Sequence, residues 1–236
     1  MSISFDGEDV VKGLLLASAL LSLIGGHALA ADAISAEPTT VHDWSGVYVG
    51  GQIGYGFGKT DAVFSSPNTP TFQASQDYDI DGFLGGVQVG YNYQINSLVL
   101  GVEADIAGSD IKGHSGEINV GVRGDTYDTK VDWFGTLRAR AGYAFDSTLI
   151  YGTGGLAYGS VENRYLGGPL NSFSEKGTKT GWTLGAGLEQ AFTDHWSANV
   201  EYLYVDLRDQ TIDYGGSNTE FDNKFSTVKI GMNYKF

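Results

Sequence analysis

Residues 44–58 read WSGVYVGGQIGYGFG, and this stretch decides the fold. Apolar side chains recur at every second position, from Val47 through Ile53 to Phe57, and therefore share one face of an extended chain. A period of two predicts a β-strand, whereas an amphipathic helix repeats about every 3.6 residues. The same alternation predicts seven further strands near residues 83–93, 98–106, 133–145, 149–158, 182–192, 196–204 and 228–236.

The strand predicted at 149–158 changes phase along its length. Leu149 and Tyr151 fit one face, whereas the end of the segment, at Tyr158, fits the other. Because a β-bulge inserts one extra residue, a bulge at Gly154-Gly155 would reconcile the two halves.

The segments between the strands alternate in length. Long polar segments follow the first, third, fifth and seventh strands, at 58–82, 109–130, 160–178 and 206–225. Short turns follow the others, at 94–97, 146–148 and 193–195. About ten residues per tilted strand suffice to cross a membrane, and closure leaves no backbone group unpaired in lipid. The pattern predicts an all-β fold: an eight-stranded antiparallel up-and-down transmembrane β-barrel with long extracellular loops and short periplasmic turns.

Aromatic residues on the apolar face gather near the ends of the predicted strands. One group, at the short turns, comprises Trp44, Tyr91, Tyr93, Tyr143, Phe145, Phe192, Trp196, Tyr234 and Phe236. The other, at the long loops, comprises Tyr55, Phe57, Phe83, Trp133, Tyr158, Trp182 and Tyr204. Two aromatic girdles around an aliphatic belt indicate that this face meets lipid.

The opposite face of the strands combines glycines with charged residues. Seven charges are predicted to lie inside the barrel: Glu103, Asp105, Arg138, Arg140, Glu189, Glu201 and Lys229. Equal depth in the barrel pairs Glu103 with Arg140, Asp105 with Arg138, and Glu201 with Lys229. Enclosed charges must be paired, because an isolated one costs several kcal/mol. Two interpretations stay open: a packed polar core, or a charged ladder that gates a path for small solutes.

Composition excludes several classes of protein. The chain has 236 residues, 35 of them glycine, with no cysteine and a net charge of −14. Disulfide scaffolds, cysteine-ligated zinc sites and thiol catalysis are therefore excluded. Nucleic acid is not expected as a partner, because like charges would meet.

The first residues predict an export signal. Twelve small and apolar residues run from Gly13 to Ile24 and are followed by an A-x-A site that ends at Ala30. We expect a signal peptide at 1–30 with cleavage after Ala30, a polar leader at 31–43 and a barrel domain at 44–236.

Few residues suggest other chemistry. Asp77, Asp79 and Asp81 match the start of a calcium loop, with Gly82 at the sixth position, but the twelfth position is Gln88 in place of the usual glutamate. A weak cation site and an acidic loop base are the two alternatives. No catalytic constellation is evident, and we expect neither enzymatic activity nor a cofactor.

Two motifs carry a resemblance to a known family. The opening W-S-G-x-Y-x-G-x-x-x-G-Y at 44–55 and the segment YGTGGLAYG at 151–159 resemble the Gram-negative outer-membrane immunogenic, or porin-like surface-antigen, proteins of the OmpA-like barrel superfamily. The resemblance implies location in the cell outer membrane. It also implies insertion by the barrel-assembly machinery, with help from periplasmic chaperones, through a last strand that ends on Tyr234 and Phe236.

These observations favour a structural, surface-exposed protein of the envelope. Outer-membrane lipid and lipopolysaccharide are the expected partners, with an extracellular ligand at the loops as a further one. The alternatives are a narrow porin-like channel for small solutes and an adhesin or ligand binder, for example of haem, that acts through its loops.

Overall fold

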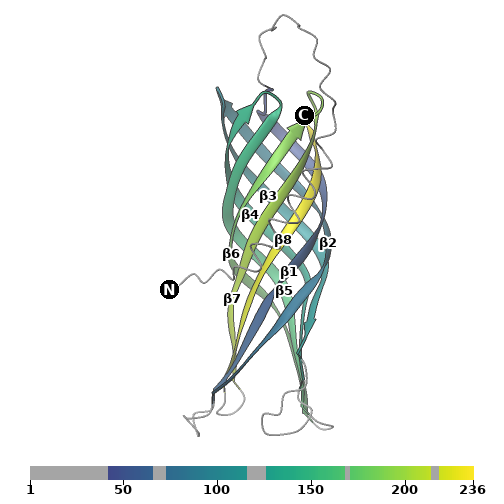
Figure 1. The fold of residues 1–236 in the computed structure, drawn as a ribbon, viewed down its shortest axis with the longest axis vertical. Coiled ribbons are helices and arrows are strands. Elements are labelled where there is room, and N and C mark those ends of the chain that lie inside the picture. The colour runs from purple at the N-terminus through teal and green to yellow at the C-terminus, as the bar shows by residue number, and fades with distance from the viewer. Residues whose placement is uncertain (1–41, 66–72, 116–125, 168–170, 214–217) are drawn as a thin grey trace, which may run out of the picture.

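The computed structural model describes residues 42–65, 73–115, 126–167, 171–213 and 218–236. Eight antiparallel strands form a closed barrel in which each strand pairs with its chain neighbours and the last pairs with the first, as Figure 1 shows. The strands are β1 Gly46–Ser65, β2 Gln73–Ile95, β3 Leu98–His114, β4 Thr126–Phe145, β5 Thr148–Gly167, β6 Asn171–Ala191, β7 Trp196–Asp213 and β8 Asn218–Lys235. The predicted fold class is confirmed.

The strands are longer than the sequence predicts. They contain 17 to 23 residues, although about 9–11 suffice to cross a bilayer. The prediction of long polar loops is therefore wrong for most of 58–82, 109–130, 160–178 and 206–225, which continue the strands. The barrel thus extends beyond the aromatic girdle at this end, which we call the long-loop rim; the opposite end is the short-turn rim.

Tight turns close the short-turn rim. Asn96 and Asp146 adopt positive φ angles of 54° and 50° in the turns after β2 and β4. Asparagine and aspartate tolerate this conformation better than other side chains, because their short polar groups bond to the nearby backbone. Both strand pairs can therefore reverse direction within two residues.

The apolar face of the strands points outward, as predicted. Ile53 in the aliphatic belt and Phe83 at the long-loop rim are 69% and 73% exposed. Rings on adjacent strands meet at the long-loop rim: Tyr55 and Phe83 have centroids 5.2 Å apart, and Trp182 and Tyr204 lie 5.4 Å apart. The exterior is consequently suited to an apolar surrounding bounded by two interfaces. No helix in the described ranges is long and apolar enough to cross a membrane.

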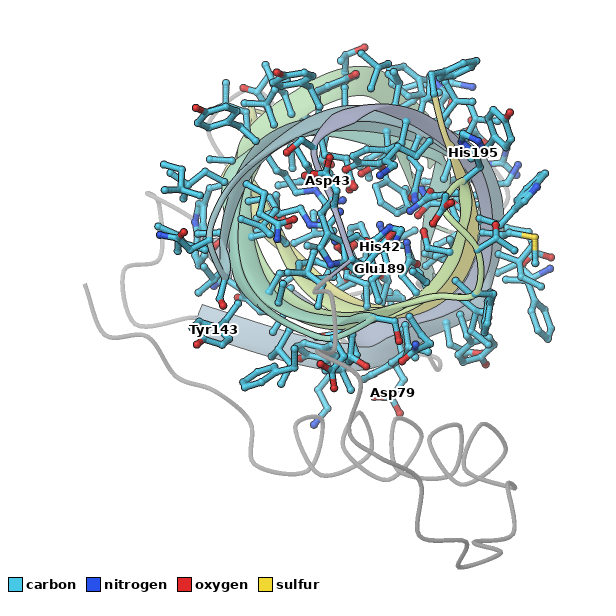
Figure 2. The ribbon with its side chains drawn as sticks, turned by 90° about the horizontal axis from the view of Figure 1, so that it is seen from above. His42, Asp43, Asp79, Tyr143, Glu189 and His195 are labelled. Atoms are coloured by element: carbon cyan, nitrogen blue, oxygen red, sulfur yellow. The ribbon has the colours of Figure 1, made fainter. Side chains whose placement is uncertain are left out.

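Trp44 corrects the predicted girdle at the short-turn rim. It is only 3% exposed and packs inside the barrel with Val99, Leu149 and Tyr151. The reason is that residues 42–45, which we call the strap, precede β1 and cross the opening. Figure 2 shows His42 and Asp43 within the outline of the barrel.

The strap is tied to opposite sides of the barrel by hydrogen bonds. The His42 backbone N–H donates to the Asp146 carbonyl at 2.8 Å, and the Trp44 N–H donates to Gln94 Oε1 at 2.7 Å. The Lys235 ammonium donates to the Asp43 carbonyl. The indole of Trp44 is thereby held as a plug at the short-turn rim.

Strand β5 contains no bulge, so the predicted bulge at Gly154-Gly155 is wrong. Its pairing with β6 runs without a register shift from Thr148 to Gly167. Leu149 and Tyr151 point into the barrel, whereas Leu156 points outward and is 63% exposed. The apolar pattern changes phase because β5 carries apolar residues on both faces, not because a residue is inserted. Among the described pairs, register shifts occur in the β3–β4, β4–β5 and β7–β8 ladders.

The interior is layered along the barrel axis. Above the Trp44 plug lies a layer of charged side chains, and toward the long-loop rim the interior is apolar. This apolar layer comprises Tyr78, Ile80, Leu84, Ala107, Ile111, Val131, Phe134, Ala157, Val161, Leu203, Val205, Leu207 and Phe225. Within it, the rings of Phe134 and Phe225 meet edge to face, with centroids 5.4 Å apart. The prediction of an interior of charges and glycines is therefore incomplete, because this apolar layer fills the part of the barrel toward the long-loop rim.

Several predicted features lie outside the described residues. They are the signal peptide with its cleavage site at Ala30, residues 31–41 of the leader, and the tips of the segments that connect the strands at the long-loop rim.

Candidate functional site: the lumen charge network

All seven predicted interior charges point into the barrel and lie together. We call Glu103, Asp105, Arg138, Arg140, Glu189, Glu201 and Lys229 the lumen charge network. Their side chains, which come from β3, β4, β6, β7 and β8, are each between 0% and 5% exposed. Water therefore has almost no access to these side chains.

Arg138 on β4 is the centre of the network. Its guanidinium donates to a Glu103 oxygen and, at 2.9 Å, to Asp105 Oδ2. A second guanidinium nitrogen, Nη1, lies 2.9 Å from Glu201 Oε1 on β7. One planar cation therefore joins three carboxylates from two strands, which suits the fixed fork of donors that arginine presents.

Arg140, one inward position further along β4, makes a second centre. It donates to a carboxylate oxygen of Glu189, whose other oxygen accepts hydrogen bonds from Ser197 and Asn233. Its guanidinium carbon lies 3.8 Å from the centroid of the Tyr151 ring, in cation–π geometry. Packing and ion pairing thus hold this cation simultaneously.

The ladder register explains which predicted pairs form. Glu201 is opposite Lys229, and their charged atoms lie 2.9 Å apart, as predicted. Asp105 contacts Arg138 as predicted, but Glu103 is directly opposite Arg138 and lies 3.7 Å from Arg140. The residue opposite Glu103 is thus Arg138 and not Arg140, two positions away from the prediction. The register of the β3–β4 pair sets this offset, and the distance of each residue from the turns does not reveal it.

Interior glycines make room for two tyrosines that complete the network. A Cβ atom at Gly90 would overlap the ring of Tyr48, and one at Gly187 would overlap the ring of Tyr151. Tyr48 donates its hydroxyl to Glu103 Oε2 at 2.6 Å, and Tyr151 donates to Glu201 Oε2 at 3.2 Å. The sequence does not reveal these two tyrosines as part of the network, because their partners lie about 50 residues away in the chain.

The other candidate residues form no comparable site. Asp77, Asp79 and Asp81 lie in β2, where successive positions on one face are about 7 Å apart, so the predicted calcium loop is not formed. Asp81 instead accepts a hydrogen bond from the Tyr55 hydroxyl. No group of three His, Cys, Asp or Glu residues suited to a metal ion occurs in the part of the chain that the structure describes. Tyr234 lies in β8, and Phe236 follows it with its N–H bonded to the Val47 carbonyl at 3.0 Å.

The strap should make stability depend on pH. Burial, followed by the nearby Lys235 charge, lowers the pKa of His42 below its usual 6.5. The unfolded chain then binds a proton more readily than the folded one, so the stabilisation is complete above pH 6.5 and decreases as the pH falls toward the lowered pKa. From about pH 7.5 to about pH 5 we expect a loss of about 1 kcal/mol or less in the free energy of unfolding.

This loss should be absent in His42→Gln and retained in His195→Gln, which changes an exposed histidine. Urea unfolding in lipid vesicles at several pH values would measure it. An unchanged pH dependence in His42→Gln would contradict this role of the strap.

Comparisons with known proteins agree with this geometry. The family model described as "Outer membrane protein beta-barrel domain" matches residues 17–236. The 31 kDa outer-membrane immunogenic protein of Brucella melitensis biotype 1 is 41% identical to this chain over 243 residues, which cover 96% of this chain and all of that protein. A 22 kDa outer membrane protein of Rhizobium leguminosarum bv. viciae is 33% identical over 195 residues, covering 82% of this chain and 78% of that protein.

Solved structures with the same fold are more distant in sequence. OprG from Pseudomonas aeruginosa has a TM-score of 0.52 and 14% identity, covering 85% of this chain and 99% of its own. The protease OmpT from Escherichia coli also has a TM-score of 0.52, with 10% identity and coverage of 81% and 97%. The closed eight-stranded barrel, its outward apolar face and the match over residues 17–236 establish that this chain belongs to the family of outer-membrane β-barrel proteins.

Proposed function

We propose that this protein is a non-enzymatic structural and surface-exposed component of the outer membrane, with an interior closed to solutes. One observation carries the proposal: the lumen charge network is 0–5% exposed, and each of its carboxylates contacts a cation. The apolar layer on one side and Trp44 on the other add two further barriers. Eight-stranded barrels generally have interiors filled by side chains.

Surface exposure is supported by the length of the strands and by the relatives. The strands continue beyond the girdle at the long-loop rim, which in such barrels faces the outside. The Brucella relatives bear the name immunogenic, which is consistent with an outer end that antibodies reach. Absence of enzymatic activity is supported by the network itself, because its carboxylates are engaged by cations and enclosed where no substrate reaches them.

Conductance distinguishes this proposal from a narrow channel. We expect the purified barrel in planar bilayers to show no steady conductance, because ions would have to pass the paired charges and then the apolar layer. Single-channel recording would measure this, with Glu103→Ala as the comparison. A steady current in the unmodified protein that changes in Glu103→Ala would replace the structural proposal with the channel.

A further inference from the structure

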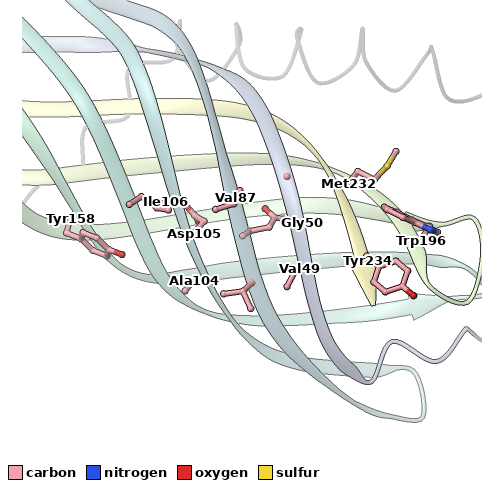
Figure 3. A pocket seen from close by; sticks show the side chains of 13 residues that line it. Val49, Gly50, Val87, Ala104, Asp105, Ile106, Tyr158, Trp196, Met232 and Tyr234 are labelled. Atoms are coloured by element: carbon pink, nitrogen blue, oxygen red, sulfur yellow. The ribbon is translucent and has the colours of Figure 1, made fainter. Parts of the chain in front are cut away.

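The strand ladders that close the barrel are complete in the part of the wall that faces lipid. Figure 3 shows a shallow apolar groove on this wall, with Trp196 and Tyr234 at one end and Tyr158 at the other. Even there, β1 pairs with β2 and with β8 without a register shift. Complete pairing is required at this depth, because a lipid-exposed backbone group without a partner is strongly unfavourable.

The ladder between β6 and β7 ends at the girdle of the long-loop rim. Its last pair is Trp182 with Asp206, although β6 reaches outward to Asn171 and β7 to Asp213, and these described residues form no further pair between the two strands. On their other sides the same strands stay paired to those ends, β6 with β5 and β7 with β8. Figure 1 shows the strands gathering into two separate groups at its lower end, the long-loop rim. The barrel is therefore open along one seam beyond the lipid.

A bulge in β7 accounts for this seam. The register of β7 against β8 shifts between Leu207 and Gln210, directly after the last pair with β6. A bulge bends its strand and increases the local twist, so β7 leaves the path of β6 at this point. A Cβ atom at Gly181 would overlap the Asp206 carbonyl, whereas one at Gly177 would meet no described atom of β7.

The hydrogen-bonding direction of each β6 residue follows from the short-turn end of the strand. The Ala191 N–H donates to the Ser147 carbonyl on the β5 side, and the next N–H, of Phe192, donates to the Trp196 carbonyl on the β7 side. This direction alternates along an antiparallel strand, and β6 pairs with β5 without a register shift. Even-numbered residues of β6 therefore direct their N–H and C=O groups toward β7. Beyond the last pair these residues include Thr180, Thr178, Lys176 and Ser174, and we call residues 174–180 the β6 edge.

The β6 edge lies in water and not in lipid. Thr180 is two residues beyond Trp182 of the girdle and Ser174 is eight, which on a tilted strand is about 5 Å and about 20 Å along the membrane normal. The even-numbered residues of the edge are all exposed. Their backbone groups are strong hydrogen-bonding groups, and an unpaired row of them is a template for another strand.

The usual protections of a strand edge are absent from residues 174–180. Proteins commonly protect an edge with a proline, with a bulge or with lysines. This segment contains no proline, and its ladder with β5 is regular. Its exposed lysine, Lys176, pairs with Asp132 on β4 at 2.5 Å, so its side chain is drawn over β5 and away from the edge. The facing strand β7 does carry a bulge, so β6 is the receptive side of the seam.

We propose that the β6 edge binds an extended peptide segment of an external protein as an added antiparallel strand. Each of its even-numbered residues offers one N–H and one C=O, and these repeat about every 7 Å, a spacing that an extended backbone matches. Beside Thr178 and Thr180, β-branched side chains of the peptide pack best. Proline is excluded from the paired stretch, because it has no N–H to donate.

This interaction goes beyond the structural role proposed above and does not depend on a closed interior. It requires only that the β6 edge lie outside the lipid. Recognition through the backbone tolerates variation in the sequence of the partner, so the class of partner is defined by its extended conformation and its β-branched residues.

The test uses the folded protein in detergent and a fluorescent peptide of seven alternating threonine and valine residues. Methylation of every second backbone nitrogen leaves this probe one hydrogen-bonding edge, so it can pair with a strand but cannot build fibrils. The control peptide is methylated on every nitrogen and has no donor. We expect fluorescence anisotropy to show about 100-fold weaker binding of the control, because about three hydrogen bonds are lost.

The matched variants Thr178→Pro and Thr178→Val place the peptide on β6. Proline removes an N–H on the free side of the strand, where the ladder with β5 does not need it, and should weaken binding about tenfold. Valine keeps the N–H and should change binding by less than about twofold. Gel migration on heating would first show that both variants fold.

Three outcomes would overturn the proposal. Equal binding of the two peptides would show that the backbone is not recognised, and equal binding by the two Thr178 variants would place the peptide elsewhere. Dimers of the unmodified protein that disappear in Thr178→Pro, measured by sedimentation without peptide, would show that a second copy occupies the edge. A conducting barrel, by contrast, would contradict only the closed interior.

Discussion

Replacing Arg138 by methionine is expected to destabilise the barrel by about 3–5 kcal/mol. Methionine keeps much of the side-chain volume but removes the cation that Glu103, Asp105 and Glu201 share. Three carboxylates would then remain enclosed with fewer partners, and their repulsion would add to the loss. The free energy of unfolding in lipid vesicles, measured by urea titration and by the shift in gel migration on heating, would report the change.

Arg164→Met is the matched control for this prediction. Arg164 also pairs with a carboxylate, Glu162, at 3.2 Å, but its side chain is exposed. Exposed pairs contribute about 1 kcal/mol or less, so this variant should change stability by no more than that. Equal destabilisation by the two arginine substitutions would show that enclosure of the network contributes nothing.

Replacing Phe134 by alanine is expected to cost about 3–5 kcal/mol of stability. Its ring is fully buried in the apolar layer against Phe225, and the closed barrel wall cannot collapse to fill the space. Phe134→Leu keeps most of the volume and should cost less than about 1.5 kcal/mol. The same unfolding measurement applies, with folding of each variant first checked by gel migration.

A double-mutant cycle with Phe225→Ala tests the contact directly. Edge-to-face ring pairs contribute about 0.5–1.5 kcal/mol beyond the area they bury, so the two substitutions should be less than additive by that amount. If Phe134→Ala were as mild as Phe134→Leu, the interior near the long-loop rim would not be a packed core.

The apolar layer shows how a visible pattern was misread. In β7, Leu203, Val205 and Leu207 alternate with Tyr202 and Tyr204, so both faces of this strand are apolar near its outer end. The outward rings dominate the pattern, so the prediction ends the strand at residue 204 and places Leu207 in the segment 206–225. Apolar residues on both faces of a strand therefore indicate that the barrel continues past the girdle at the long-loop rim, with a packed interior.

Trp44 and Glu103 could not be placed from the pattern in the same way. Trp44 is an odd number of positions from the outward-facing Val47, so alternation alone would place it on the inner face. Tryptophan is nevertheless typical of the aromatic girdle. Only the course of the strap across the opening shows that the side chain lies inside the barrel. Glu103 was assigned to the inner face correctly, whereas its main partner depends on the register of β3 against β4.

The order of side chains along each strand was determined by the sequence alone. Alternation with a period of two is a local property, so it identified the eight strands, their lipid-facing sides and the seven enclosed charges. Contacts across the interior were decided only by the tertiary structure. Gln88 and Asn233 meet at 2.6 Å although 145 residues separate them. Closure of the barrel and the register of its strands bring residues such as these two to the same depth along the barrel axis. Both closure and register depend on all eight strands together.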